Sequence, residues 1–251
     1  MRQTGFGTEG ASIRWTEADG AGPARVHVHG LGAASGPYTA HLSLDPALAG
    51  RRTLFVDLPG FGISDRPAGF GYSPEDHAEA LAAVFAAAGV TGAEVVGHSM
   101  GGAVAIVLAH RHPALVSRLV LAEARLDPHL GLLPGGSGIT AYSEEEFVRG
   151  GGFEATLERV GWLWSATMRL ADPVALHRSA VGLDRATQPT LRAMLESLDI
   201  PRDFLIGASS PDIWDRARLT DAGVRVVTVP DAAHCLMFDN PRAYAAAIAG
   251  G

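Results

Sequence analysis

The fold is decided by the stretch EVVGHSMGGA, which spans residues Glu94–Ala103. A short apolar run with the character of a buried strand leads directly into Gly-x-Ser-x-Gly, and a helix-like segment, Ala103–His110, follows. A strand that turns into a helix within a few residues strains the backbone of Ser99, and side chains at Gly97 and Gly101 would collide there. The pattern therefore predicts a nucleophile elbow that raises the Ser99 hydroxyl above a sheet.

Apolar runs elsewhere in the chain predict further strands. Several are continuous Val, Leu and Ile runs, which suit strands buried on both faces of a parallel sheet. The expected strands are Ile13–Thr16, Arg25–His29, Thr53–Asp57, Glu94–Gly97, Arg118–Glu123, Asp203–Gly207 and Val224–Val229. Helical patterns alternate with them, and the clearest begins at Ser73, continues with Pro74 and ends at Gly89. This alternation predicts an α/β fold with a mostly parallel central sheet flanked by helices.

One segment interrupts the alternation of strands and helices. From about Pro128 to about Ile200 there is no convincing strand, but there are several helix-like stretches and a group of aromatic residues. We therefore expect a helical cap, residues 128–200, on a core domain formed by residues 1–127 and 201–251. Trp162 and Trp164 of this cap are candidate substrate-binding residues, and packing within the cap is the alternative for each of them.

Composition excludes several kinds of chemistry. The 251 residues include 20 Lys and Arg against 27 Asp and Glu, every one of the 20 is Arg, and there is a single Cys. A Schiff-base lysine, a Walker lysine and a multi-cysteine metal site are therefore excluded. The net charge of -7 disfavours binding to nucleic acid or to an anionic membrane. We expect a cytoplasmic protein that needs no cofactor and no metal, and the sequence does not determine its oligomeric state.

With these elements in place, the chain resembles the α/β-hydrolase family along nearly its whole length. The segment His29–Gly32 follows an early strand and is similar to the family's HG loop. Asp57–Pro67 is similar to its DxxGxGxS segment, and Val229–His234 resembles the loop that carries the catalytic histidine. The glycine that usually precedes that histidine is Ala233 here, a mild departure from the family pattern.

The resemblance implies a role for each of these positions. Ser99 is the expected nucleophile, and His234 is the expected base that takes its proton. By the match to the HG loop and the elbow, the backbone amides of Leu31 and Met100 are the expected oxyanion donors. No cofactor or metal is implied.

The acid of the triad has two candidates. The family usually places it after the penultimate strand, where this chain has Ser210, whose hydroxyl cannot stabilise an imidazolium as a carboxylate does. Asp212 lies two residues later. Glu123 ends the apolar strand expected beside the elbow strand, a position that some family members, including certain haloalkane dehalogenases, use for their acid. We favour Glu123 and keep Asp212 as the alternative.

These residues together predict a serine hydrolase that works through a Ser-His-acid triad and an acyl-enzyme. The apolar cap favours a small or medium hydrophobic ester, thioester or lactone as the small-molecule substrate. Serine at the elbow argues against dehalogenases and epoxide hydrolases, since those relatives carry aspartate there. A C–C bond hydrolase, a cofactor-free haloperoxidase-like enzyme and a non-hydrolytic ligand-binding receptor or pseudoenzyme are the alternatives on the same fold.

Overall fold

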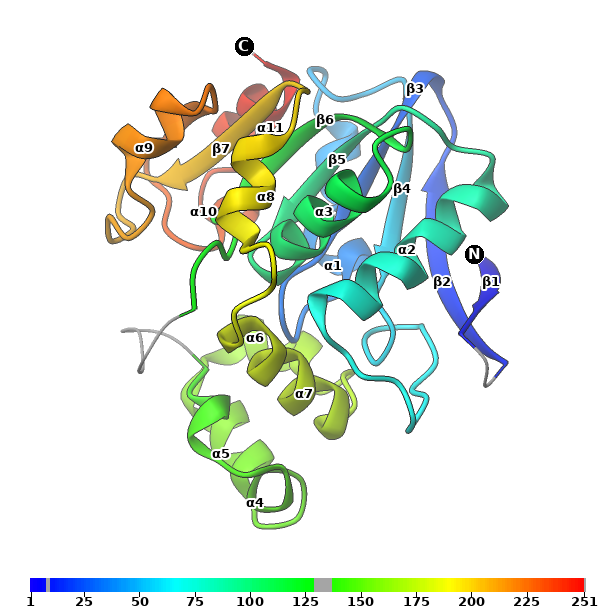
Figure 1. Cartoon of the computed structure of the whole chain (residues 1–251), viewed down its shortest axis with the longest axis vertical. Coiled ribbons are helices and arrows are strands. Elements are labelled where there is room, and N and C mark those ends of the chain that lie inside the picture. Colours follow the sequence, from blue (N-terminus) through cyan, green and yellow to red (C-terminus); the bar gives the residue numbers. More distant parts are fainter. Residues whose placement is uncertain (8–9, 129–136, 251) are drawn as a thin grey trace.

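The computed structural model describes residues 1–7, 10–128 and 137–250 (Figure 1). The described residues form an eight-stranded sheet in the order β1-β2-β4-β3-β5-β6-β7-β8. The strands are β1 (Arg2–Phe6), β2 (Ala11–Ala18), β3 (Ala21–Val28), β4 (Arg51–Asp57), β5 (Ala93–His98), β6 (Val116–Ala122), β7 (Arg202–Gly207) and β8 (Arg225–Val229). Strands β3 to β8 pair in parallel, whereas β1 and β2 pair antiparallel at one edge. The predicted α/β fold with a mostly parallel sheet is confirmed.

Each of the seven expected strands coincides with one of β2 to β8, but β1 was not predicted. This strand runs along the sheet edge, where Arg2 faces Trp15 of β2 across an antiparallel pairing. Its first four residues are not buried, and only Phe6 reaches the core. An edge strand of this kind has no apolar run or strict alternation, so the sequence carries no signal for it.

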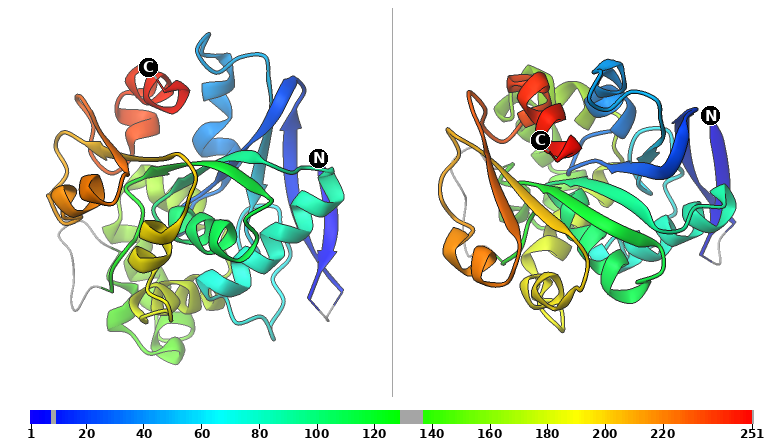
Figure 2. Two further views of the ribbon diagram at one scale, coloured as in Figure 1. Left: turned by 45° about the horizontal axis from the view of Figure 1, so that its top comes forward. Right: turned by 90° about the horizontal axis from the view of Figure 1, so that it is seen from above.

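Helices cover both faces of the sheet, as the two views of Figure 2 show. Helix α2 begins with a reciprocal capping box between Ser73 and Asp76 and ends at Gly89 with φ 61°, as its sequence pattern predicts. It packs with α3 and α8 on one face, and α1, α10 and α11 lie on the other. The helices are α1 (Ser35–Thr39), η1 (Ala40–Leu44), α2 (Pro74–Ala88), α3 (Met100–Arg111), α8 (Leu191–Ser197), α9 (Arg216–Asp221), α10 (Leu236–Asp239) and α11 (Pro241–Ala249). None of the helices in the described ranges is long and apolar enough to cross a membrane.

The connection between β6 and β7 contains helices and loops but no strand in its described parts, residues 123–128 and 137–201. It contains η2 (Ile139–Ala141), α4 (Glu144–Val148), α5 (Gly152–Arg159), α6 (Trp162–Met168), α7 (Pro173–Asp184) and the α8 already named. Figure 1 shows α4 to α7 gathered below the sheet, whereas α8 packs beside α3. The cap boundaries 128–200 stay a prediction, and residues 129–136 of that range lie outside the described residues.

A row of alternating charges crosses the sheet toward the amino ends of its parallel strands. Arg25 of β3 contacts Glu94 of β5 at 2.5 Å, and Arg118 of β6 contacts the other oxygen of Glu94 at 2.5 Å. Arg118 also pairs with Asp203 of β7, which Arg225 of β8 meets at 2.7 Å. Burial favours a raised pKa for Glu94, but the neighbouring guanidinium groups outweigh it and lower the pKa. We call these five residues the charge ladder.

Candidate active site

Ser99 occupies the sharp turn between β5 and α3. Its backbone angles, φ 52° and ψ -115°, are unusual for any residue other than glycine. The glycines around it are sterically required, since a Cβ on Gly97 would lie 2.6 Å from the Gly101 oxygen. A Cβ on Gly101 would lie 2.2 Å from the Val28 oxygen. The elbow therefore has the strand–turn–helix geometry that its sequence predicts.

Glu123 and His234 meet beside this elbow. Strand β6 ends at Ala122, and Glu123 follows with φ 47°, while its N–H donates to the Leu205 oxygen of β7 at 2.9 Å. His234 lies in the loop after β8, and its Nδ1 is 2.8 Å from Oε2 of Glu123. The Glu123 side chain is 2% exposed and that of His234 is 49% exposed. A buried carboxylate thus orients an imidazole whose other nitrogen remains available for proton transfer.

Two further donors hold the Glu123 carboxylate. The N–H of Gly207 donates to Oε1 at 2.9 Å, and the side chain of Ser210 also hydrogen-bonds to the carboxylate. Burial favours a raised pKa for Glu123, but the hydrogen bonds from His234, Ser210 and Gly207 outweigh it and lower the pKa. The carboxylate therefore stays ionised at neutral pH. Ser210, which stands at the family's usual acid position, contacts the acid from the neighbouring strand end.

The alternative acid, Asp212, is turned elsewhere. Its side chain is 62% exposed, and its Oδ1 pairs with Arg216 Nε at 3.3 Å, four residues along the chain. Of the two carboxylates that the sequence leaves open, the structure brings Glu123 to His234.

His98, which precedes the nucleophile, supports the histidine loop in a way that the sequence does not reveal. Because a carbonyl can only accept, Nε2–H of His98 donates to the His234 carbonyl oxygen at 2.9 Å. The two imidazole rings lie with centroids 4.7 Å apart. Burial, together with the nearby charge of His234, lowers the pKa of His98 to about 3, so its ring stays neutral.

A small cavity of about 30 Å³ joins these groups. Ser99, His98 and His234 line it together with apolar and small residues, which are Gly30, Leu31, Ala33, Tyr38, Trp164 and Cys235. Leu31 therefore lies at the cavity, as expected for the HG loop. Met100 is the first residue of α3, so its N–H has no acceptor within the helix.

The two tryptophans proposed for substrate binding separate in the structure. Trp164 lines the cavity, and its Nε1–H donates to the Leu31 oxygen at 2.7 Å. Trp162 is 81% exposed and lies outside the cavity lining, because the short α6 turns it to the opposite side. The structure brings only Trp164 to the site.

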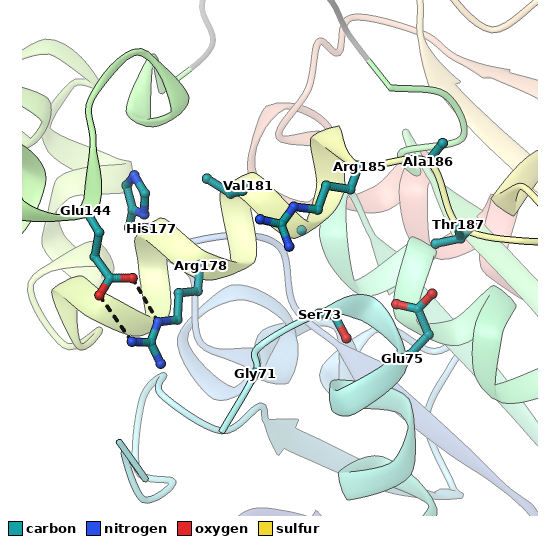
Figure 3. Close-up of a pocket in the computed structure, with 11 residues that line it drawn as sticks. Gly71, Ser73, Glu75, Glu144, His177, Arg178, Val181, Arg185, Ala186 and Thr187 are labelled. Carbon is teal, nitrogen blue, oxygen red and sulfur yellow. Dashed lines mark hydrogen bonds and ion pairs between the residues drawn. The ribbon is translucent and has the colours of Figure 1, made fainter. Parts of the chain in front are cut away.

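A larger cavity of about 530 Å³ lies between α2 and α7 and shares no lining residue with the cavity at Ser99 (Figure 3). One of its walls is closed by the ion pair between Arg178 and Glu144, with contacts of 2.8 and 3.1 Å. Within the described ranges of the chain, no cluster of His, Cys, Asp and Glu side chains is arranged to hold a metal ion.

Comparison with known proteins agrees with this geometry. The family model described as alpha/beta hydrolase fold matches residues 26–145, which include the HG loop, the elbow and Glu123. An esterase from Exiguobacterium antarcticum superposes with a TM-score of 0.80 at 21% identity, covering 96% of each chain. A thermophilic esterase from Thermogutta terrifontis gives a TM-score of 0.76 at 21% identity, covering 99% of this chain and 97% of that one.

The chain has the α/β-hydrolase fold. A 2-hydroxymuconate semialdehyde hydrolase from Pseudomonas putida is 40% identical over 94 residues, which are 38% of this chain and 34% of that protein. The chain thus matches less than half the length of this curated relative. These similar proteins are named as esterases and as a hydrolase.

Proposed function

We propose that the protein is a serine hydrolase of small or medium hydrophobic esters, thioesters or lactones, with Ser99, His234 and Glu123 as its triad. The observation that carries this proposal is the 2.8 Å contact between Glu123 Oε2 and His234 Nδ1 beside the elbow serine. His234 takes the Ser99 proton while Ser99 Oγ attacks the carbonyl carbon. His234 then protonates the leaving group, and water resolves the acyl-enzyme with His234 as base.

The amides of Leu31 and Met100 are the proposed donors to the tetrahedral oxyanion. Two placements support them: Leu31 shares a cavity with Ser99, and Met100 begins α3, whose N-terminus favours negative charge. A Cβ added to Gly30 would lie 3.2 Å from Ser99 Cβ, so the HG loop passes directly beside the nucleophile. In this proposal α4 to α7 form the cap over the site.

The lining of the cavity favours an uncharged acyl group. Apart from the imidazoles, its described side chains are apolar, hydroxyl or thiol groups, with no arginine among them. A carboxylate-bearing acyl group would lose its hydration there without gaining a cationic partner. Trp164 and Leu31 instead offer apolar contact.

A C–C bond hydrolase is the second candidate, because the 2-hydroxymuconate semialdehyde hydrolase is 40% identical over its matched 94 residues. That substrate name denotes a carboxylate, which the described lining does not pair with a cation. An ester therefore ranks first. The receptor hypothesis rested on a displaced acid, and the contact of Glu123 with His234 removes that support. The cytoplasmic location stays a prediction.

The proposal is tested with p-nitrophenyl esters of rising acyl length and the Ser99→Ala variant. We expect wild-type turnover of the shorter esters, stoichiometric labelling of Ser99 by an organophosphorus probe, and loss of both in Ser99→Ala without loss of fold. Wild-type turnover by Ser99→Ala would overturn the serine mechanism. Cleavage of a carboxylated dienone with no ester turnover would favour the C–C hydrolase.

A further inference from the structure

The turn Gly30–Ala33, which carries the proposed donor amide of Leu31, does not fix its own central peptide. The Ala33 N–H donates to the Gly30 oxygen at 3.2 Å, and Gly32 at the third position has φ 67°. These features define a type II turn. Type I differs mainly by a flip of the peptide between the two central residues, and glycine at the third position tolerates both. The Leu31–Gly32 peptide must therefore be held from outside the turn.

His29 holds the first peptide of the turn from the core side. Its Nε2 accepts from the Leu58 N–H at 3.0 Å, which leaves the ring proton on Nδ1. Nδ1–H then donates to the Gly30 oxygen at 2.8 Å. In a trans peptide the N–H points away from the C=O, so this bond sets the direction of the Leu31 N–H. His29 makes no contact with the Leu31–Gly32 peptide through these bonds.

Helix α6 holds the central and following peptides. Trp164 Nε1–H donates to the Leu31 oxygen at 2.7 Å, and Thr167 Oγ1–H donates to the Gly32 oxygen at 3.0 Å. The packing is tight, because a Cβ on Gly32 would lie 2.9 Å from Met168 Cε and 3.0 Å from Trp164 Nε1. These donors come from a helix more than 130 residues further along the chain.

We propose that Trp164 is a positioning residue. His29 holds the peptide that carries the Leu31 N–H, and the bond from Trp164 to the Leu31 oxygen holds the other side of the same residue, so that Leu31 is fixed at both of its peptides only when α6 lies on the turn. The inference rests on the serine-hydrolase function proposed above. A cavity of about 30 Å³ holds roughly one water molecule. Trp164 also lines this cavity, so the residue that holds Leu31 borders the space beside Ser99.

The test is Trp164→Phe, which keeps an aromatic ring but removes the N–H donor. Loss of an oxyanion donor itself costs about 10²- to 10³-fold in kcat, so loss of its support should cost about 10- to 100-fold. We expect this fall in kcat on p-nitrophenyl acetate with KM changed by less than about threefold. The inhibition constant of a trifluoromethyl ketone, whose adduct carries the oxyanion, should rise in parallel with the loss in kcat/KM.

Two comparisons isolate the hydrogen bonds from general damage to the helix. Trp162→Phe alters the exposed tryptophan of the same helix and should leave kcat unchanged. Thr167→Val, which loses the hydroxyl, should lower kcat, and Thr167→Ser, which keeps it, should restore kcat. If Trp164→Phe fails to fold, the two Thr167 variants test whether hydrogen bonds from α6 position the turn.

The outcomes separate this inference from the proposed function. A raised KM with unchanged kcat in Trp164→Phe, or equal losses in Trp162→Phe, would overturn the positioning role and leave Trp164 as a wall of the pocket. If Ser99→Ala is inactive while Trp164→Phe matches the wild type, only the positioning role fails. Full activity of Ser99→Ala would instead remove the serine mechanism itself.

Discussion

The two ends of the parallel sheet both bury carboxylates, but they neutralise them with different partners. At the amino ends, Glu94 and Asp203 of the charge ladder contact only arginines among the ion pairs of the described chain. At the carboxyl ends, Glu123 contacts His234. Burial opposes ionisation of all three carboxylates, and in each case the partners more than compensate, because the pKa is lowered.

The difference lies in what the partner can do with a proton. A guanidinium stays protonated at every accessible pH, so the ladder can bind strands together but cannot transfer a proton. An imidazole can accept a proton on one ring nitrogen while the other contacts a carboxylate, so the pair of Glu123 and His234 can support proton transfer. Both ends use buried charge, but only the histidine end is suited to catalysis.

The largest expected effect is on turnover, at the histidine end. Glu123→Gln keeps the size of the side chain but cannot stabilise an imidazolium, and we expect kcat to fall by about 10²- to 10⁴-fold with little change in stability. Asp212→Asn, the matched control, should lose less than about tenfold. Steady-state kinetics on a short p-nitrophenyl ester measures both. A larger loss of kcat in Asp212→Asn than in Glu123→Gln would assign the acid to Asp212 and would contradict the comparison of the two sheet ends.

At the arginine end the expected effect is on stability. Arg118→Met removes the cation that Glu94 and Asp203 share but leaves Glu94 with Arg25 and Arg51, and Asp203 with Arg225. We therefore expect the free energy of unfolding to fall by about 1–3 kcal/mol. Urea unfolding gives the free energy, and kcat per folded molecule should stay near the wild-type value.

Arg225→Met is the control for Arg118→Met, since the Arg225 side chain is 44% exposed at the end of the ladder. Its loss should cost less than about 1 kcal/mol. Equal costs for the two variants would mean that the ladder does not act as a buried network.

The smallest expected effect is a pH dependence that separates the two ends. His98 is held neutral with a pKa of about 3, so on acidification below the ordinary histidine pKa the unfolded chain binds a proton that the folded chain does not. Stability is therefore lost as the pH falls from about 6.5, while the ladder carboxylates remain ionised. The amide of the variant His98→Gln can still donate to the His234 carbonyl. This variant should reduce the dependence of the unfolding free energy on pH by up to about 1.4 kcal/mol per pH unit. The free energy of unfolding is measured by urea titration at pH 7 and at pH 5. An equal change between the two pH values in the wild type and in His98→Gln would contradict the prediction.

Local patterns explain what could be predicted from the sequence. Strands β2 to β8, α2 and the elbow arise from apolar runs, caps and glycine spacing within a few residues of one another, and these were predicted. The choice between Glu123 and Asp212 depends on the positive φ of Glu123 and on the side-by-side order of β5, β6 and β7. No local sequence pattern indicates the backbone angle or the strand order, so both carboxylates remained candidates for the acid.

Contacts between distant segments were beyond the sequence for the same reason. The hydrogen bond from Trp164 to Leu31 joins segments that share no motif. Trp164 points inward and Trp162 outward because the two residues lie on opposite sides of the seven-residue helix α6. The link from His98 to the His234 carbonyl depends on the loop after β8 folding back over β5. The family's usual acid position at Ser210 was the one available signal that this region is altered.

The position of Glu123 also bears on how such an enzyme can diverge. Ser99 and Glu123 follow the two strands of one β5–α3–β6 unit, so the proposed nucleophile and the proposed acid are inherited together in a single short segment of the gene. The loop after β7 keeps only the Ser210 hydroxyl as its tie to the acid. Insertions and exchanges in residues 211–215 can then accumulate without removing a member of the proposed triad, which makes this loop a place for new specificity to evolve.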